Sequence, residues 1–321
     1  MPRRRLGRTA LEIGVMGLGC APIGGLYRAS SMAEALATVR AAAAGGINHF
    51  DVAPQYGRGL AEGRLGAALA ALSGADTVLS TKVGRLLEPL SDAPELPNWP
   101  EALPYSEVYD VTPEGIRRSL RDSQQRLGRD RIDLLLLHDP DRYASGEGLR
   151  ELIAEAQRTM TLLRDSGAVS AIGLGVNAPE PCRMALELGG WDCFLLAGTY
   201  SVIAQDDAGL LARCAREGVS VLVGGPYMSG ALAGGTTWRY RPIPPQIDAR
   251  IAALRQICAD HEVEVEAAAL QFPLRHPAVA SVVVGMRNGD EVRQNLAFLQ
   301  RDIPPEFWSA LCQAGLAEVA A

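Results

Sequence analysis

Four side chains with complementary chemistry end or follow apolar runs in the first half of the chain: Asp51, Tyr56, Lys82 and His138. Lys82 is the only lysine among the 31 lysine and arginine residues. An ammonium, unlike a guanidinium, is a compact point charge that can lie against another titrating group and shift its pKa. A carboxylate, a phenol, an ammonium and an imidazole together suit proton transfer to or from a carbonyl oxygen.

The phenol of Tyr56 needs a neighbouring charge to work as an acid or base, because its ordinary pKa is about 10. A cation about 4 Å away contributes roughly 4 kcal/mol at an effective dielectric of about 20, or about three pKa units before the cost of burial. We therefore expect Lys82 to bring the pKa of Tyr56 to about 7, where general acid–base catalysis works best. Asp51 would keep Lys82 charged, and His138 would orient the substrate oxygen by a hydrogen bond.

Eight apolar runs are continuous rather than alternating, which is typical of parallel strands covered on both faces. They occupy residues 13–19, 47–51, 77–82, 132–138, 169–176, 193–198, 219–225 and 279–285. Helical segments fall between them, one of which begins with Thr112 and Pro113 and ends at Gly128. This order predicts the α/β class and a single (β/α)₈ TIM barrel over residues 1–321, with residues 3–14 as a hairpin across its bottom.

Asp51, Lys82 and His138 end the second, third and fourth predicted strands, so the barrel would bring them together at the rim where barrel enzymes keep their active sites. Two long loops follow the third and seventh strands, over residues 85–111 and 226–246. Long ordered loops in compact domains are usually functional. Their aromatic residues could cover a sugar or a planar heterocycle, or could simply pin the loops; the candidates for substrate binding are Trp99, Trp238 and Tyr240.

Composition excludes several classes of partner. A net charge of −6 and a pI near 5.4 argue against nucleic acid and anionic membranes. The chain has no run of roughly 18 apolar residues that could span a membrane. The cysteines and histidines lack metal-ligand spacing, so we expect no metal, and we expect His49 to face away from Asp51 on its strand. The expected protein is cytoplasmic, acts on a small molecule, and is a monomer or small homo-oligomer.

Three segments, "HFDVAPQYG", "STKVGR" and "RDRIDLLLLHDPD", resemble the aldo-keto reductase superfamily. The resemblance implies a catalytic tetrad at Asp51, Tyr56, Lys82 and His138. The segments "CFLLAGTYSVI" and "VSVLVGGPYMSGALA" are similar to the branch that contains D-threo-aldose 1-dehydrogenase, L-fucose dehydrogenase and pyridoxal 4-dehydrogenase.

The same resemblance implies a nicotinamide cofactor laid across the barrel mouth. Asn177 matches the family residue that bonds the carboxamide of the nicotinamide. Gly225 falls near where a ring usually stacks on the nicotinamide, and the neighbouring Tyr227 could substitute for that ring; Pro226 between them is a further cofactor-binding candidate, and Ala197 stands where the family has a glutamine.

At the other end of the cofactor, backbone groups at Gly285, Met286 and Arg287 would meet the phosphates, and Asn295 matches the residue that bonds adenine. Glu291 stands where NADP-dependent members have an arginine for the 2′-phosphate. A carboxylate there favours NAD, because it repels that phosphate and can accept hydrogen bonds from free ribose hydroxyls. Arg287 could instead pair with the phosphate and allow NADP.

The resemblance favours NAD-dependent oxidation of an aldose at C1 to the lactone, with Tyr56 as the acid–base. An NADPH-dependent aldehyde or ketone reductase and a pyridoxal dehydrogenase are the alternatives. A cofactor-sensing regulatory barrel without catalysis is a remote one.

Overall fold

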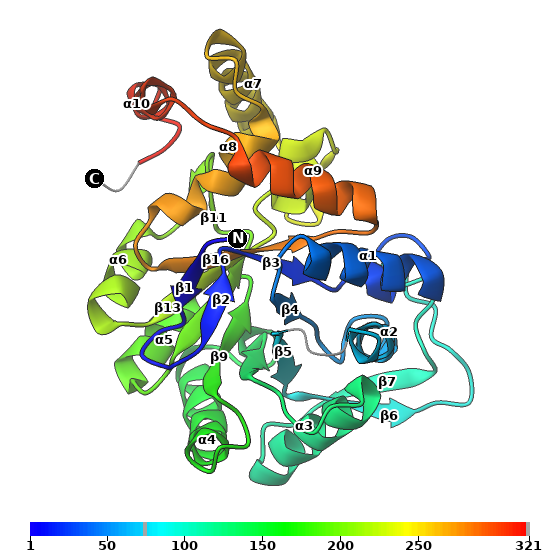
Figure 1. The fold of residues 1–321 in the computed structure, drawn as a ribbon. Coiled ribbons are helices and arrows are strands. Elements are labelled where there is room, and N and C mark those ends of the chain that lie inside the picture. Colours follow the sequence, from blue (N-terminus) through cyan, green and yellow to red (C-terminus); the bar gives the residue numbers. More distant parts are fainter. Residues whose placement is uncertain (73–75, 319–321) are drawn as a thin grey trace.

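The computed structural model describes residues 1–72 and 76–318, and its centre is a closed barrel of eight parallel strands (Figure 1). Seven of the eight strands fall within the predicted runs and the third extends one residue past its run, to Val83, so the predicted (β/α)₈ barrel is confirmed. The barrel closes where the last strand pairs with the first, with Gly285 opposite Gly19. The strands are β3 (Met16–Gly19), β4 (His49–Asp51), β5 (Val78–Val83), β8 (Leu134–His138), β9 (Ala171–Val176), β10 (Cys193–Ala197), β13 (Ser220–Gly224) and β16 (Val279–Gly285).

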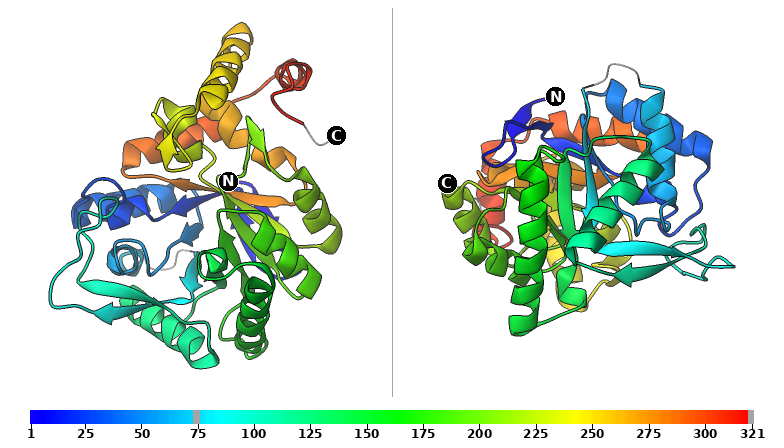
Figure 2. Two further views of the ribbon diagram at one scale, coloured as in Figure 1. Left: turned by 180° about the vertical axis from the view of Figure 1, so that it is seen from behind. Right: turned by 90° about the horizontal axis from the view of Figure 1, so that it is seen from below.

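Helices surround the barrel and begin where the sequence supplies caps (Figures 1 and 2). Ser31 and Glu34 form a reciprocal capping box, which satisfies two backbone donors at the start of the first helix. Gly128 ends a helix in the left-handed conformation. The helices are α1 (Met32–Ala44), α2 (Leu60–Ala70), α3 (Pro113–Leu127), α4 (Gly146–Asp165), α5 (Glu180–Leu188), α6 (Ala208–Glu217), α7 (Pro245–Asp260), α8 (Val265–Gln271), α9 (Gly289–Gln300) and α10 (Pro305–Gln313).

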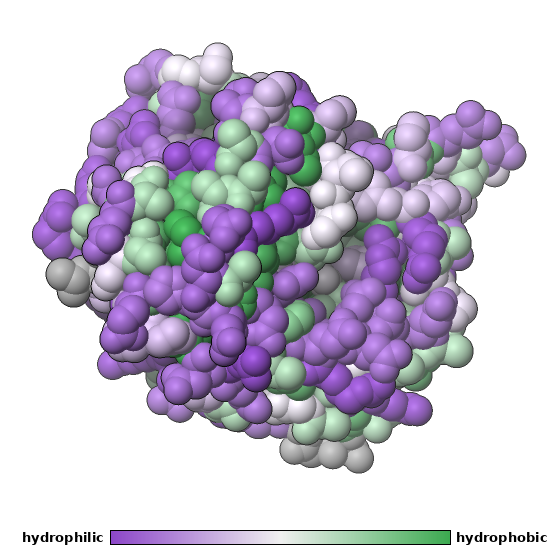
Figure 3. Space-filling model, turned by 90° about the horizontal axis from the view of Figure 1, so that it is seen from above, coloured by the Kyte–Doolittle hydropathy of each residue, from purple (hydrophilic) through white to green (hydrophobic). Residues whose placement is uncertain are grey.

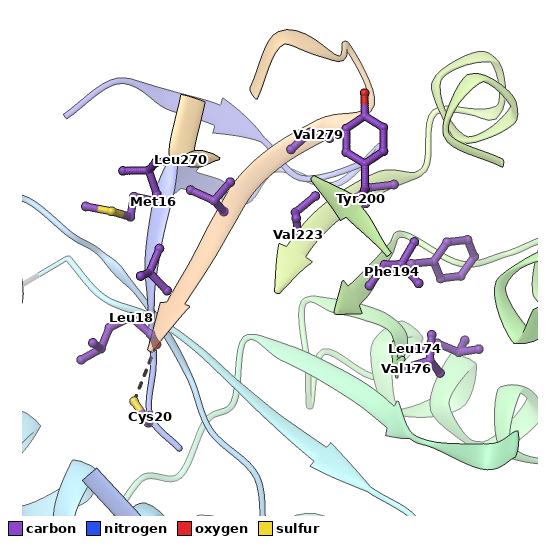
Figure 4. Packing of buried hydrophobic residues seen from close by; sticks show 14 of the residues in the cluster. Met16, Leu18, Cys20, Leu174, Val176, Phe194, Tyr200, Val223, Leu270 and Val279 are labelled. Atoms are coloured by element: carbon purple, nitrogen blue, oxygen red, sulfur yellow. Dashed lines mark hydrogen bonds between the residues drawn. The ribbon is translucent and has the colours of Figure 1, made fainter. Parts of the chain in front are cut away.

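Two apolar layers follow from strand alternation. On β8, Leu135 and Leu137 pack outward into the main core, whereas Leu134 and Leu136 belong to a second cluster inside the barrel. Figure 4 shows part of the main core, including Leu174 and Val176 from β9 and Phe194 from β10.

The predicted N-terminal hairpin, β1 (Arg3–Arg5) and β2 (Glu12–Gly14), closes the barrel at the ends where the strands begin. Its Leu6 and Ile13 are fully buried in the inner cluster. Arg4 donates to the carbonyl of Leu274. The hairpin and the loops after the strands lie toward opposite ends of the barrel (Figure 2, right), so the bottom is plugged and the top is left for the site.

Both predicted long loops are ordered, and each contains a small antiparallel sheet. The first holds β6 (Arg85–Pro89) and β7 (Tyr105–Tyr109). The second holds the 3₁₀ segment Met228–Ala233 and the pair β14 (Thr237–Trp238) and β15 (Arg241–Pro242). A further pair, β11 (Tyr200–Ser201) and β12 (Ala204–Gln205), follows β10.

The face of the molecule in Figure 3 is covered mainly by hydrophilic residues, with apolar residues in smaller patches. None of the helices within residues 1–72 and 76–318 is long and apolar enough to cross a membrane.

Candidate active site

Lys82 is the centre of a buried polar cluster inside the top of the barrel. Its ammonium donates to Asp51 Oδ2 at 2.8 Å, to the hydroxyl of Tyr56 at 3.1 Å and to the carbonyl of Val52 at 2.9 Å. Asp51 and Lys82 are 2% and 1% exposed. An ammonium has three hydrogens, and each has an acceptor here, so the position of the charge is fixed.

The pKa of Tyr56 does not follow the prediction from sequence. Burial raises the pKa to about 12; the charge of Lys82 opposes this, and the charge of Asp51 adds to it. The prediction of about 7 is therefore wrong for the protein alone. The reason is that burial raises the pKa of Tyr56 by more than the charge of Lys82 lowers it. The ammonium also lies closer to the carboxylate of Asp51 than to the phenol. Tyr56 is thus a neutral phenol, a proton donor, at neutral pH.

Lys82 itself stays charged. Burial lowers the pKa of Lys82, but Asp51 and Tyr56 more than offset it, and the net direction is upward. A buried cation paired with a carboxylate at 2.8 Å is the expected compensation for its lost hydration.

His138, at the end of β8, lies with its ring perpendicular to the ring of Tyr56, with centroids 6.3 Å apart. Burial, with the nearby charges of Arg85 and Lys82, holds the pKa of His138 well below its ordinary value. Its Nδ1 is buried and finds no hydrogen-bond partner in the described part of the chain. His138 is thus a neutral imidazole beside Tyr56, and it is not one of the residues that line the neighbouring cavity.

A cavity of about 530 Å³ opens above this cluster. Its walls include the side chains of Asp51 and Tyr56 and the backbones of Gly198, Gly224 and Gly225. A Cβ atom added at Gly225 would meet nothing within 4 Å, so a flat ring can approach the backbone closely there. Glycine backbones beside a phenol suit a planar ring that must lie near a proton donor.

Most of the residues predicted to bind the cofactor do line this cavity. They are Asn177, Gly225, Pro226, Tyr227, Gly285, Arg287 and Glu291. The side chain of Met286 is instead fully buried in the main core, so this residue can offer only its backbone. Asn295 is 8% exposed and lies behind the wall, where it accepts from the hydroxyl of Tyr227 and donates to the carbonyl of Glu291.

Charges of both signs meet at the far end of the cavity. Glu291 accepts from the backbone N–H of Arg287 at 2.8 Å and from Asn288 Nδ2 at 3.2 Å. The guanidinium of Arg287 donates to the carbonyl of Leu26, while its Nη1 is buried without a partner in the described residues. Burial and the charge of Arg28 lower the pKa of Arg287. A guanidinium beside a cavity can bind an anionic oxygen.

The three aromatic residues predicted to bind substrate lie in three different surroundings. The indole of Trp99 stacks on the ring of Tyr56. Tyr240 lines the cavity and is 58% exposed. Trp238 is 6% exposed and packs in the main core with Arg239 against its ring, and it is not part of the cavity wall. The expectation for Trp238 was wrong because the β14–β15 pair turns its indole inward.

Sequence reasoning missed two buried residues, one of which contacts Asp51 directly and the other through the first. Ser80 Oγ donates to Asp51 Oδ1 at 2.8 Å, and His49 Nε2 lies 3.0 Å from Ser80 Oγ. The prediction that His49 faces away from Asp51 was wrong, because residues two apart on a strand share a face. The same period places Ser80 beneath Lys82, so the signal was present in the sequence.

A second missed network holds Asn177. Asp139 accepts from Asn177 Nδ2 with one oxygen, at 3.0 Å, and from Arg85 Nη2 with the other, at 2.9 Å. Asp139 has a φ of 43°, which is uncommon for a residue with a side chain. Arg85 also donates to the hydroxyl of Tyr143 and to Glu107. The β6–β7 loop is thereby connected to the wall of the cavity.

Comparison with known protein families now identifies the fold and the chemistry. The model of the Aldo/keto reductase family matches residues 15–315. The chain belongs to the aldo/keto reductase family. It is therefore an oxidoreductase, and aldo-keto reductases use nicotinamide cofactors.

Individual relatives of known name match nearly the whole length of this chain. Pyridoxal 4-dehydrogenase from Microbacterium luteolum is 39% identical over 335 aligned positions, covering 98% of this chain and 97% of that protein. D-threo-aldose 1-dehydrogenase from a Pseudomonas species is 37% identical, covering 96% of both. Among solved structures, an aldo-keto reductase from Bacillus halodurans in its holo form superimposes with a TM-score of 0.79 over the whole chain, at 24% identity. That structural likeness supports the fold alone.

Proposed function

We propose that this aldo-keto reductase oxidises a cyclic hemiacetal to a lactone with NAD⁺ as the acceptor. The observation that carries the proposal is the contact of 3.1 Å between Lys82 and Tyr56 at the floor of the cavity. Two relatives of similar identity are named for aldose and pyridoxal oxidation. Aldoses and pyridoxal share one chemical feature, an aldehyde that closes on a hydroxyl group of the same molecule to form a hemiacetal.

In this mechanism the phenolate of Tyr56 accepts the proton of the anomeric hydroxyl as the C–H bond at that carbon breaks. A bound nicotinamide cofactor would accept the hydride. Lys82 stabilises the phenolate, and Asp51 keeps Lys82 charged and in place. His138 holds the substrate oxygen through a hydrogen bond, so that the carbonyl of the lactone forms where the hydroxyl was.

Asn177 would hold the carboxamide of the cofactor, with its amide already oriented by Asp139. Gly225 and its neighbours Pro226 and Tyr227 would lie against the ring, and Arg287 and the backbone at Gly285 against the phosphates. We propose NAD rather than NADP because Glu291, held by two hydrogen bonds, lines the cavity with a carboxylate that would accept from ribose hydroxyls and repel a 2′-phosphate.

One observation favours a second candidate, the reduction of small aldehydes or ketones with NADPH. A phenol with a pKa near 12 is protonated at neutral pH, which is the form that donates a proton to a carbonyl. Oxidation requires the opposite form, and the positive charge of the oxidised nicotinamide would lower the pKa of Tyr56 in the loaded site.

The test is a panel of D-arabinose, L-fucose, L-galactose, D-threose and pyridoxal with NAD⁺, with the lactone identified by mass spectrometry. We expect turnover of at least one of them, and loss of that turnover in Tyr56→Phe with the fold intact. Turnover of none, together with rapid NADPH consumption on small aldehydes, would reject the proposed dehydrogenase activity in favour of the reductase.

A further inference from the structure

A continuous line of hydrogen bonds runs from the interior of the barrel to the phenol. It joins His49 to Ser80, Ser80 to Asp51, Asp51 to Lys82 and Lys82 to Tyr56, with heavy-atom separations of 3.0, 2.8, 2.8 and 3.1 Å. His49 and Ser80 are fully buried. This line ends inside the protein and not at solvent, so it cannot deliver protons to water.

The direction of each bond follows from the number of hydrogens. An ionised carboxylate only accepts, so Ser80 must give its single hydroxyl hydrogen to Asp51. The hydroxyl of Ser80 then accepts from His49, which requires a hydrogen on Nε2 of the imidazole. Nδ1 of His49 is buried without a partner in the described residues and faces Gly17, where an added Cβ atom would lie 2.6 Å away. The ring is thus neutral and in a single tautomer.

The two oxygens of Asp51 have separate partners as a result. Oδ1 is held by Ser80, which leaves Oδ2 for Lys82. Without Ser80, Oδ1 would also turn toward the ammonium, and a carboxylate that engages the ammonium with both oxygens draws it away from Tyr56.

We propose that Ser80 and His49 are positioning residues that divide the oxygens of Asp51, so that Lys82 remains within hydrogen-bond distance of Tyr56. This inference rests on the proposed role of Tyr56 as the acid–base. It assigns no proton transfer to His49, whose imidazole remains neutral throughout the reaction.

The pH readout depends on every charged or titratable group around the phenol. Lys82 and Asp51 face Tyr56 from β5 and β4, His138 faces it from β8, and Tyr240 faces it from the second long loop. Cys20, at the end of β3, lies near Asp51 and Lys82, and burial raises the pKa of its thiol, so it stays neutral over the working range.

The adjacent residue on β5 provides a matched control. Thr81 is also fully buried, and its hydroxyl donates to a buried carboxylate, Glu62 Oε1, at 2.8 Å. Thr81 lies on the outer face of the strand, away from Lys82. Ser80→Ala and Thr81→Val therefore each remove one buried hydroxyl-to-carboxylate bond, but only the first should affect the phenol.

The first experiment measures kcat, KM and their pH dependence on whichever substrate the wild type turns over best. In Ser80→Ala we expect kcat to fall about tenfold, a fraction of what general acid–base catalysis contributes. The limb of the pH profile of kcat that is assigned to Tyr56 should move to higher pH, and KM for the cofactor should not change. Ser80→Thr, which keeps the hydroxyl, should recover most of the loss, and Thr81→Val should match the wild type. Equal effects of Ser80→Ala and Thr81→Val, or no effect of either, would overturn the proposal.

The second experiment does not depend on activity. NMR of the protein labelled with ¹⁵N-histidine, with the His49 signal identified by its loss in His49→Gln, should show this imidazole in the neutral Nε2–H form without titration above pH 5, since burial lowers the pKa of His49 to about 4. His49→Gln, which keeps an N–H donor, should preserve kcat better than His49→Leu. An Nδ1–H tautomer, or equal activity of the two variants, contradicts the assignment even if the proposed substrates are correct. If Ser80→Ala fails to fold, these measurements decide.

Discussion

The indole of Trp99 lies stacked on the ring of Tyr56, with centroids 5.7 Å apart and planes inclined by 19°. A loop residue far along the chain thus covers one face of the group that handles the proton. The ammonium of Lys82, on the barrel strand β5, lies 4.8 Å from the centroid of the same ring. Cover by a loop and charge from the barrel act on the pKa of Tyr56 in opposite directions.

Replacing Trp99 by Leu should expose Tyr56 to water and lower its pKa, because burial is the largest cause of the upward shift. The acidic limb of the oxidation profile should move to lower pH, while KM for the substrate rises about tenfold through lost stacking. Trp99→Phe is the control and should change both less. An unshifted profile in Trp99→Leu would show that the indole does not govern the burial of the phenol.

Replacing Lys82 by Met should lower kcat about 10²- to 10⁴-fold, the range attributed to positioned acid–base groups. Stability should also fall by about 3–5 kcal/mol, because Asp51 would remain buried without its partner. Lys82→Arg should not restore activity, since a planar guanidinium cannot match three acceptors around one nitrogen. Steady-state kinetics and urea unfolding check both parts, and a fully active Lys82→Arg would disprove the point-charge argument.

The two reaction directions should respond to pH in opposite ways. Reduction requires the phenol, which persists up to a pKa of about 12, so kcat/KM for reduction should be flat through neutral pH. Oxidation requires the phenolate, so its kcat/KM should rise with pH until the pKa of the cofactor-loaded enzyme is reached. Both profiles can be measured on one substrate and its product. An oxidation rate that is constant from acid to neutral pH would exclude Tyr56 as the base.

Asp139→Asn should weaken both the fold and the cofactor site. Arg85 would lose one of its two carboxylate partners while remaining 3% exposed. The free energy of unfolding should fall by about 3 kcal/mol, the lower value for breaking a buried ion pair. Binding of NADH should weaken as well, because an asparagine has one acceptor oxygen in place of two, so Arg85 and Asn177 would compete for it. Thermal melting and fluorescence titration measure the two effects. Glu107→Gln, which removes the other partner of Arg85, should lower the melting temperature without changing NADH binding.

Glu291→Gln should shift cofactor choice toward NADP. Removing one negative charge from the cavity wall should tighten NADPH binding about fivefold relative to NADH, since a like charge about 4 Å away costs roughly 1 kcal/mol in water-like surroundings. The ratio of the two dissociation constants, measured by fluorescence titration, is the readout. Asp290→Asn lies in the same turn but pairs with Arg293 at the surface, so it should leave the ratio unchanged. A ratio that does not move in Glu291→Gln would assign selectivity to Arg287.

Features set by local pattern could be predicted from the sequence. The eight buried strands can be recognised as continuous apolar runs. Because Asp51, Lys82 and His138 come at or near the ends of neighbouring strands, they were expected at one rim of the barrel. The pKa of Tyr56 could not be predicted, because it depends on how deeply Trp99 and the barrel bury the phenol. Trp238 was misplaced because the pairing of β14 with β15, and not composition, decides which way its indole points. His49 and Ser80 could have been found by following the two-residue period one step further down β4 and β5.

The three hydrogen bonds of the Lys82 ammonium also affect how readily this protein is modified by aldehydes and reducing sugars. Primary amines condense with reducing sugars and aldehydes to imines, and a lysine-rich surface would be steadily modified by such compounds. The one ε-amino group in this sequence is buried, protonated and bound on all three sides, and every other basic side chain except the histidines is a guanidinium. Glycation and amine-directed labelling should therefore be confined to the terminal amine of the chain.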